Sequence, residues 1–285
     1  MRLTADHLDP AERDALLAAL AWQAELGVDE CIGEMVVDRF GLPDPVAQPR
    51  VPESEEPGQG QTQPPTRAPA QPQPDQGIAA ARMAASAAQS LDDLRAAMEA
   101  FDGCALQKGA RTTVFADGNP AARVMIIGEA PGPEEDRSGR PFVGRSGHLL
   151  DRMLAAIGLS RTSEDPASAV YIANAIPWRP VGNREPSADE TEMMWAFLER
   201  HIQLAKPEFI VTMGRAPASM LMQDSVRVRR IHGQWYKPAR AQGHPFMPTL
   251  HPTSLLRLPA EKARAWGDLL NLRAALDGAA LSFEG

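Results

Sequence analysis

Residues 101–285 alternate between two patterns of apolar and polar positions. Short runs rich in Val, Ile and Phe predict buried strands, and longer segments with apolar residues three and four positions apart predict helices. The predicted strands are residues 123–128, 169–176, 208–213 and 245–250. The predicted helices are residues 146–157, 187–205, 215–222 and 261–276. Because strands that alternate with helices form a parallel sheet covered on both faces, we expect a three-layer α/β/α fold around a mostly parallel, four-stranded sheet.

The first hundred residues predict helices but no strands. Residues 10–40 predict two short helices, the first of which Pro10 opens, and residues 77–100 are rich in alanine and helical, with Ser90 as an N-cap. Between them, residues 43–75 contain ten of the 26 prolines and no aromatic residue. Such a segment buries too little apolar surface to offset its ordering entropy, so we interpret it as a disordered linker. The chain therefore divides into a small helical segment (1–42), the linker (43–75) and a main domain (76–285).

The two cysteines, Cys31 and Cys104, stand on opposite sides of the predicted linker. This number excludes a disulfide framework and a four-cysteine metal site, and it suits a reducing compartment. No apolar run has the length of a membrane span, and the N-terminus lacks the basic-then-apolar pattern of a signal peptide. We therefore expect a soluble cytoplasmic protein with no membrane partner.

Charge is distributed unevenly along the chain, whose net charge is −8. Residues 1–100 hold 7 Lys and Arg against 17 Asp and Glu, whereas residues 101–285 hold 22 against 20. Residues 225–260 hold six basic residues and no acidic one: Arg227, Arg229, Arg230, Lys237, Arg240 and Arg257. A basic cluster this small is usually only a solvated part of the surface. The alternative is that it lets this acidic protein present a basic face to phosphates.

Polar side chains stand at the carboxyl ends of three predicted strands. Glu129 follows the first strand, Asn174 lies near the end of the second, and His251 follows the last. Each has a common structural role, as a helix cap, a turn residue or a core histidine. Because the carboxyl ends of parallel strands share one edge, where α/β proteins bind ligands, we expect the three to form a site.

Five motifs carry a resemblance to a known family. They are GEAPG with EED, GRPFVGRSG, VYIANAIPWRPVGNREP, IVTMGRAPA and HPTSLLR, in that order along the chain. Together they resemble the family 4 uracil-DNA glycosylases, over roughly residues 101–275 as the core of the domain. Nothing before residue 90 takes part in the resemblance.

The resemblance implies roles for the residues at the predicted sheet edge. The amide of Asn174 accepts a hydrogen bond from uracil N3–H and donates to O4, which rejects cytosine. Phe142 stacks on the base, and the backbone of Gly128, Glu129 and Ala130 contributes amide donors to a uracil oxygen. His251 donates to O2 as negative charge develops there, and Glu129 positions water or stabilises the sugar cation.

The resemblance also implies DNA contacts outside the base pocket. Leu255 and Leu256 form a wedge that fills the gap left by the flipped nucleotide, and Arg257 binds a phosphate. Further phosphate contacts are expected at Ser146, Asn183, Arg184 and Arg215.

The chain departs from the family at the four cysteines that hold a four-iron, four-sulfur cluster. The corresponding positions here are Phe101, Cys104, Trp178 and Trp195, so Cys104 is the one family ligand that remains. Because one thiolate cannot hold such a cluster, we expect no iron–sulfur cofactor and no other metal, with a hydrophobic plug in its place.

We therefore expect a monomeric uracil-DNA glycosylase that initiates base-excision repair on uracil-containing DNA. The alternative is a DNA-binding protein that recognises uracil or abasic sites without turnover. In either case, residues 1–42 are candidates for docking a repair or replication protein.

Overall fold

The computed structural model of this protein describes residues 74–284. The helices predicted within residues 10–40, nearly all of the predicted linker and the docking role of residues 1–42 lie outside this part of the chain. Residues 74 and 75, the expected end of the linker, instead open helix α2 (Pro74–Ala87). Within the described residues, no helix combines the length and the hydropathy that crossing a membrane requires.

The central sheet has five strands in the order β1-β3-β2-β4-β5. Their bounds are β1 Ala116–Gly118, β2 Val124–Gly128, β3 Val170–Asn174, β4 Phe209–Met213 and β5 Phe246–Thr249. Strands β3, β2, β4 and β5 pair in parallel, as predicted, whereas β1 pairs antiparallel with β3. The prediction of four strands is therefore wrong. Strand β1 has three partly exposed residues, too few for a recognisable alternation.

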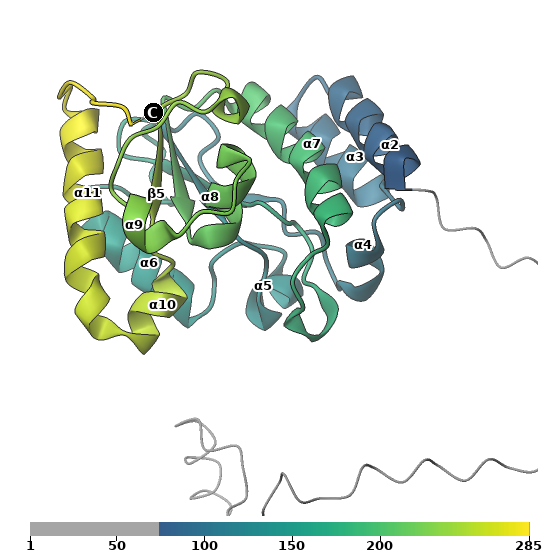
Figure 1. Ribbon diagram of the computed structural model, residues 1–285, viewed down its shortest axis with the longest axis horizontal. Coiled ribbons are helices and arrows are strands. Elements are labelled where there is room, and N and C mark those ends of the chain that lie inside the picture. The colour runs from purple at the N-terminus through teal and green to yellow at the C-terminus, as the bar shows by residue number, and fades with distance from the viewer. Residues whose placement is uncertain (1–73, 285) are drawn as a thin grey trace, which may run out of the picture. The chain divides into compact units, whose positions relative to one another are not determined.

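Helices cover both faces of the sheet, which confirms the three-layer arrangement. Helices α2, α3 (Leu91–Ala100) and α7 (Ala188–Ala205) lie on one side, and α6 (Arg145–Ala155) and α11 (Lys262–Leu276) lie on the other, as Figure 1 shows. Successive residues of β2 face opposite layers, so Met125 and Ile127 pack toward α7 while Val124 and Ile126 pack toward α6 and α11.

Local chemistry fixes several helix ends. The segment predicted as helical over residues 77–100 divides into α2 and α3, and the side-chain oxygen of Ser90 caps α3 by accepting from Asp93 N at 3.1 Å. Helix α8 (Arg215–Met222) has the predicted bounds. The elements that the pattern did not predict are short. They are α4 Ala105–Gly109, α5 Pro133–Ser138, α9 Val228–Ile231, α10 Pro252–Arg257 and the 3-10 turns Val181–Asn183, Ala239–Ala241 and Pro259–Glu261.

One hydrogen-bonded pair of side chains lies inside the core between β3 and α7. The Tyr171 hydroxyl and His201 Nε2 are 2.8 Å apart, and the His201 ring stacks on Phe115 with centroids 4.5 Å apart. Burial lowers the pKa of His201 to about 3, so its ring is neutral at ordinary pH. This histidine has a structural role.

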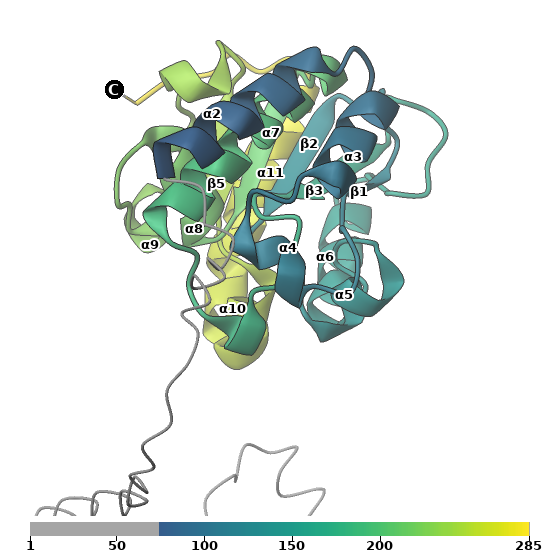
Figure 2. The same ribbon diagram turned by 90° about the vertical axis from the view of Figure 1, so that its right-hand side faces the viewer.

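The chain segments that leave the carboxyl ends of the parallel strands gather along one edge of the sheet. Helices α5 and α10, which follow β2 and β5, lie below the sheet in both views (Figures 1 and 2). This is the edge at which the sequence predicts a site.

Candidate functional site

Strands β2 and β3 bring the first two predicted site residues to the same level. Gly128 and Asn174 are register partners at the ends of these strands. Beyond them, the amides of Ala175 and Ile176 donate to the carbonyls of Gly128 and Glu129 at 2.8 and 2.9 Å. These bonds continue the pairing past the strand ends and hold both chain segments at the edge of the sheet.

Gly128, Phe142, Asn174 and His251 form one group, here called the Phe142 cluster. A Cβ atom on Gly128 would lie 2.5 Å from Cε2 of Phe142 and closer still to Oδ1 of Asn174, so only glycine fits at this strand end. The ring of Phe142 stacks on that of His251, with centroids 5.6 Å apart and planes 29° apart. Three residues predicted to contact the base are therefore in mutual contact, and one of them, Phe142, adjoins the predicted catalytic histidine.

Asn174 brings an amide group into this cluster. The residue is 8% exposed, and within the described part of the chain no residue pairs with its amide by a hydrogen bond. A primary amide offers two donors and an acceptor, which therefore stay available to a ligand. The arrangement is suited to a ligand that presents both an N–H and a carbonyl.

The imidazole of His251 is held in one tautomer. His251 caps helix α10, and its Nδ1 accepts a hydrogen bond from Thr253 N at 3.2 Å. Burial lowers the pKa of His251 to about 4; nearby Glu135 raises the pKa and Arg257 lowers it, both to a smaller extent. The neutral ring therefore carries its proton on Nε2, which makes this atom a hydrogen-bond donor at neutral pH.

Glu129 lies at the wall of a cavity rather than in the Phe142 cluster. Its side chain reaches the cavity, but the surrounding protein desolvates it enough to raise the pKa of its carboxyl group. Arg215 opposes this shift, and Glu185 adds to it. Ala130 lines the same cavity.

The cavity is open, has a volume of about 1250 Å³ and is rich in arginine. Five of the six basic residues in the 225–260 run line it, all except Lys237, together with Arg184 and Arg215. His251 lies on the same wall and so connects the cavity with the Phe142 cluster. Four carboxylates also line the cavity: Glu129, Glu185, Asp224 and Glu261. Arginine therefore outnumbers acid on a surface beside the predicted site.

The predicted phosphate contacts differ in their present partners. Both terminal nitrogens of Arg184 donate to Glu190, at 2.7 and 2.6 Å, and Arg215 pairs with Glu185 at 2.8 Å. Asn183 lines the cavity and accepts from Arg179 at 3.2 Å, and Arg257 is exposed. Ser146 is half-buried in the first turn of α6 and does not line the cavity.

The two leucines of the expected wedge are not equivalent. Leu255 is 1% exposed and lines a small apolar pocket with Leu149 and Leu269 from α6 and α11. Its burial does not suit insertion into DNA. Leu256 is half-buried, and Leu258, at the cavity wall, is 49% exposed.

Large aromatic side chains fill three of the four positions at which the resemblance implies cluster cysteines, and Cys104 stands at the fourth. Phe101, Cys104, Trp178 and Trp195 are all buried in the core. The indole N–H of Trp178 donates to Thr113 Oγ1 at 3.0 Å, and the Arg240 guanidinium lies 4.6 Å from the ring centre of Trp195.

The remaining thiol is a poor metal ligand. Burial raises the pKa of Cys104 to about 11, so the thiol stays protonated. Among residues 74–284, no three His, Cys, Asp or Glu side chains are grouped so that they could hold a metal ion. The residues present therefore do not fit an iron–sulfur cluster.

The local sequence pattern indicates neither the role of Glu135 nor any role of Arg161. Glu135 is buried, and its carboxylate accepts from the amides of Gly132, Val143 and Gly144 at 3.0, 2.9 and 3.0 Å. It thereby ties the loop after β2 to the segment that carries Phe142. The EED motif marks these acids, but no local pattern indicates which of them turns inward.

Comparisons with known proteins identify the superfamily of this chain. The family model of the uracil DNA glycosylase superfamily matches residues 115–270. A type-4 uracil-DNA glycosylase of Archaeoglobus fulgidus is 35% identical over 176 residues, which cover 60% of this chain and 85% of the relative. The type-4 enzyme of Thermotoga maritima is 35% identical, over 56% of this chain and 80% of the relative. The type-4 enzyme of Saccharolobus solfataricus is 34% identical, over 64% of this chain and 84% of the relative. This chain belongs to the uracil-DNA glycosylase superfamily.

Proposed function

We propose that this protein is a uracil-DNA glycosylase, which takes uracil out of the DNA stack, hydrolyses its N-glycosidic bond and initiates base-excision repair. The observation that carries the proposal is the Phe142 cluster, which adjoins an arginine-lined cavity at the carboxyl edge of the sheet. Membership of the superfamily supports the same activity.

Asn174 and Phe142 recognise the base. The amide of Asn174 accepts from uracil N3–H and donates to O4, while cytosine presents the opposite pattern and leaves both groups unpaired. Phe142 provides a flat apolar face for stacking. The backbone amides beyond Gly128, at Glu129 and Ala130, provide donors for a uracil oxygen.

His251 and Glu129 stabilise the two charges that bond cleavage creates. The Nε2–H of neutral His251 donates to O2 of uracil as the base leaves as an anion. The carboxylate of Glu129, on the other side of the bond, stabilises the positive sugar or orients the attacking water. When bound DNA displaces water from this wall, both interactions strengthen, because the local dielectric constant falls.

DNA binds across the cavity. Arg257 and the other arginines of the cavity wall meet phosphates, with Ser146, Asn183, Arg184 and Arg215 as further contacts. Arg184 and Arg215 exchange their present carboxylate partners for phosphates. Leu256, which is more accessible than Leu255, provides the wedge beside the flipped nucleotide.

The remaining assignments concern the rest of the chain. We assign residues 74–285 to the catalytic domain and residues 43–73 to a linker. Residues 1–42 dock a repair or replication protein. The enzyme acts as a monomer in the cytoplasm, which suits its two cysteines.

We also propose that catalysis needs no iron–sulfur cluster. The purified protein should be colourless and iron-free, because Phe101, Trp178 and Trp195 cannot ligate iron and the Cys104 thiol is protonated. Visible absorption spectroscopy and iron analysis check this on protein expressed with ample iron. Stoichiometric iron with a broad visible band contradicts the proposal.

The experiment that tests the function is release of uracil from DNA. The purified protein is incubated with an oligonucleotide containing one uracil, and alkali then cleaves any abasic site. We expect cleavage at the uracil position and none in the matched thymine oligonucleotide. Tight binding of the uracil or abasic oligonucleotide without uracil release contradicts the proposal and supports a recognition protein without turnover.

A further inference from the structure

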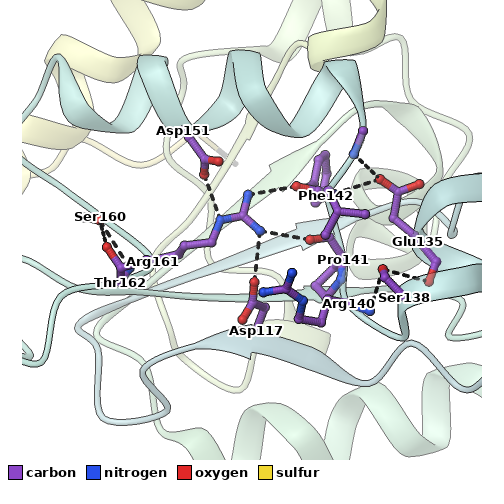
Figure 3. Close-up of polar contacts among 12 residues, drawn as sticks. Asp117, Glu135, Ser138, Arg140, Pro141, Phe142, Asp151, Ser160, Arg161 and Thr162 are labelled. Carbon is purple, nitrogen blue, oxygen red and sulfur yellow. Dashed lines mark hydrogen bonds and ion pairs between the residues drawn. The ribbon is translucent and has the colours of Figure 1, made fainter.

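Arg161 lies in the chain between α6 and β3, and its guanidinium makes four hydrogen bonds (Figure 3). Its side chain is 10% exposed. Nε donates to Asp151 at 2.7 Å and Nη1 donates to Asp117 at 3.1 Å. Nη1 and Nη2 also donate to the carbonyl oxygens of Pro141 and Phe142, at 2.9 and 3.0 Å. Four separate acceptors thus converge on one buried cation, and two of them belong to the segment that carries the stacking ring.

The backbone of Phe142 needs such support. Its φ angle is +53°, in the left-handed region that residues other than glycine rarely adopt. Helix α6 approaches its carbonyl closely, because a Cβ on Gly147 would overlap the Phe142 carbonyl group. Unfavourable backbone conformations persist where the surroundings fix them, and they are frequent at functional sites.

Two buried groups fix this conformation from opposite sides. Arg161 holds the carbonyl oxygens of residues 141 and 142, whereas Glu135 holds the amides of Val143 and Gly144. Figure 3 shows Arg161 and Glu135 on either side of Phe142. The peptide groups before and after the ring are therefore both restrained, with the ring against Gly128 and His251.

We propose that Arg161 is a positioning residue for uracil excision, which acts by holding Phe142 in its left-handed conformation beneath the flipped base. The inference rests on the proposed function. Arg161 does not line the cavity and so does not touch DNA there; its effect reaches the base through the Phe142 ring.

Arginine is the residue type that this position requires. A guanidinium has five N–H donors in a rigid plane, and four acceptors in different directions use them here. Asp117 on β1 and Asp151 on α6 hold the guanidinium itself, so its direction is set before DNA binds. Lysine keeps the charge between the two aspartates but cannot reach both carbonyl oxygens and both carboxylates from one nitrogen.

The test compares Arg161→Lys and Arg161→Gln with the parent in single-turnover uracil excision. We expect the rate constant to fall by about 100-fold, the typical effect of a small misplacement near a reacting group. DNA affinity and reaction amplitude should stay unchanged, because phosphate contacts set the affinity and the protein remains folded. Asp151→Asn, which loosens the guanidinium without removing it, should give a smaller loss in the same direction.

A double-mutant cycle separates positioning from general stabilisation. In a Phe142→Ala background the Arg161→Lys change should alter the rate by less than about threefold, since the ring on which it acts is gone. Arg123→Gln is the matched control. Arg123 also binds a carboxylate and a carbonyl, of Glu208 and Leu276, but at the opposite edge of the sheet. It should lower the melting temperature and leave the rate constant within about threefold of the parent.

Several results would overturn the proposal. One is an equal loss of rate in the parent and Phe142→Ala backgrounds, and another is a loss confined to amplitude or to melting temperature. An unchanged rate in Arg161→Lys and Asp151→Asn also refutes it, whether or not Arg161→Gln folds. A parent protein that releases no uracil refutes the proposed function instead, and the inference with it.

Discussion

The Asn174→Ala variant should lose at least about 100-fold in the single-turnover rate of uracil excision, as enzymes do when one donor to a developing oxyanion is deleted. Alanine removes the only side chain at the cluster that can both accept from N3–H and donate to O4. The base then leaves the stack without a partner for its polar edge, so the energy of unstacking is no longer offset.

The same variant should be no less stable than the parent. The Asn174 amide makes no hydrogen bond within the described residues, so alanine removes none of the bonds that hold the fold. Thermal melting checks this expectation, and Asn119→Ala is the control. The Asn119 amide donates to Glu164 O and accepts from Ala121 N at the amino end of the sheet. Asn119→Ala should therefore lower the melting temperature and leave the excision rate unchanged. Excision by Asn174→Ala within a few-fold of the parent rate contradicts the assignment of this residue.

The His251→Ala variant should also lose about 100-fold or more in excision rate, because the leaving uracil anion loses its Nε2–H donor. Single-turnover kinetics measure this loss, with His148→Ala, an exposed change on α6, as the control. Near-parent activity of His251→Ala would show that another group stabilises the anion.

His251 should also affect how stability depends on pH. Its pKa is about 4 in the folded protein against 6.5 in an unfolded chain, so the unfolded state binds the proton more tightly. The contribution of the neutral imidazole to the free energy of unfolding is complete above pH 6.5 and is lost as pH falls from there toward about 4. The free energy of unfolding should therefore drop less on acidification in His251→Ala than in the parent. Denaturant titrations of both proteins at about pH 7.5 and about pH 5.5 test this. Because His201 contributes equally to both proteins, the difference between them reports on His251.

The sequence predicts the large elements of the fold and the place of the site. Strands β2 to β5 are continuous apolar runs, and the longer helices have clear apolar periodicity. Parallel strands also place their carboxyl ends at one edge. That edge joins Gly128 and Asn174 and brings His251 beside Phe142. Strand β1 and the short helices contain too few residues for any periodicity, so they emerge only in the structure.

The sequence does not predict which neighbour in a motif turns inward. Leu255 and Leu256 are adjacent and chemically equal, and the packing of α10 on α6 and α11 buries the first of them. The sequence likewise does not predict that Glu135 and Arg161 turn inward, because their hydrogen-bond partners lie farther away along the chain. The four acceptors of Arg161 lie at positions 117, 141, 142 and 151, and no local spacing links them to it.

The Tyr171–His201 pair has a consequence for the fidelity of folding. Both faces of β3 are buried, so apolar burial alone distinguishes poorly between its native alignment and one shifted by a single residue. A shift of this kind would turn Tyr171 away from His201 and leave a hydroxyl and an imidazole unpaired inside the core. The same shift would carry Asn174 to the opposite face, away from Gly128. A hydrogen bond remote from the proposed site thus selects the alignment that keeps Asn174 beside Gly128, as the proposed base recognition requires.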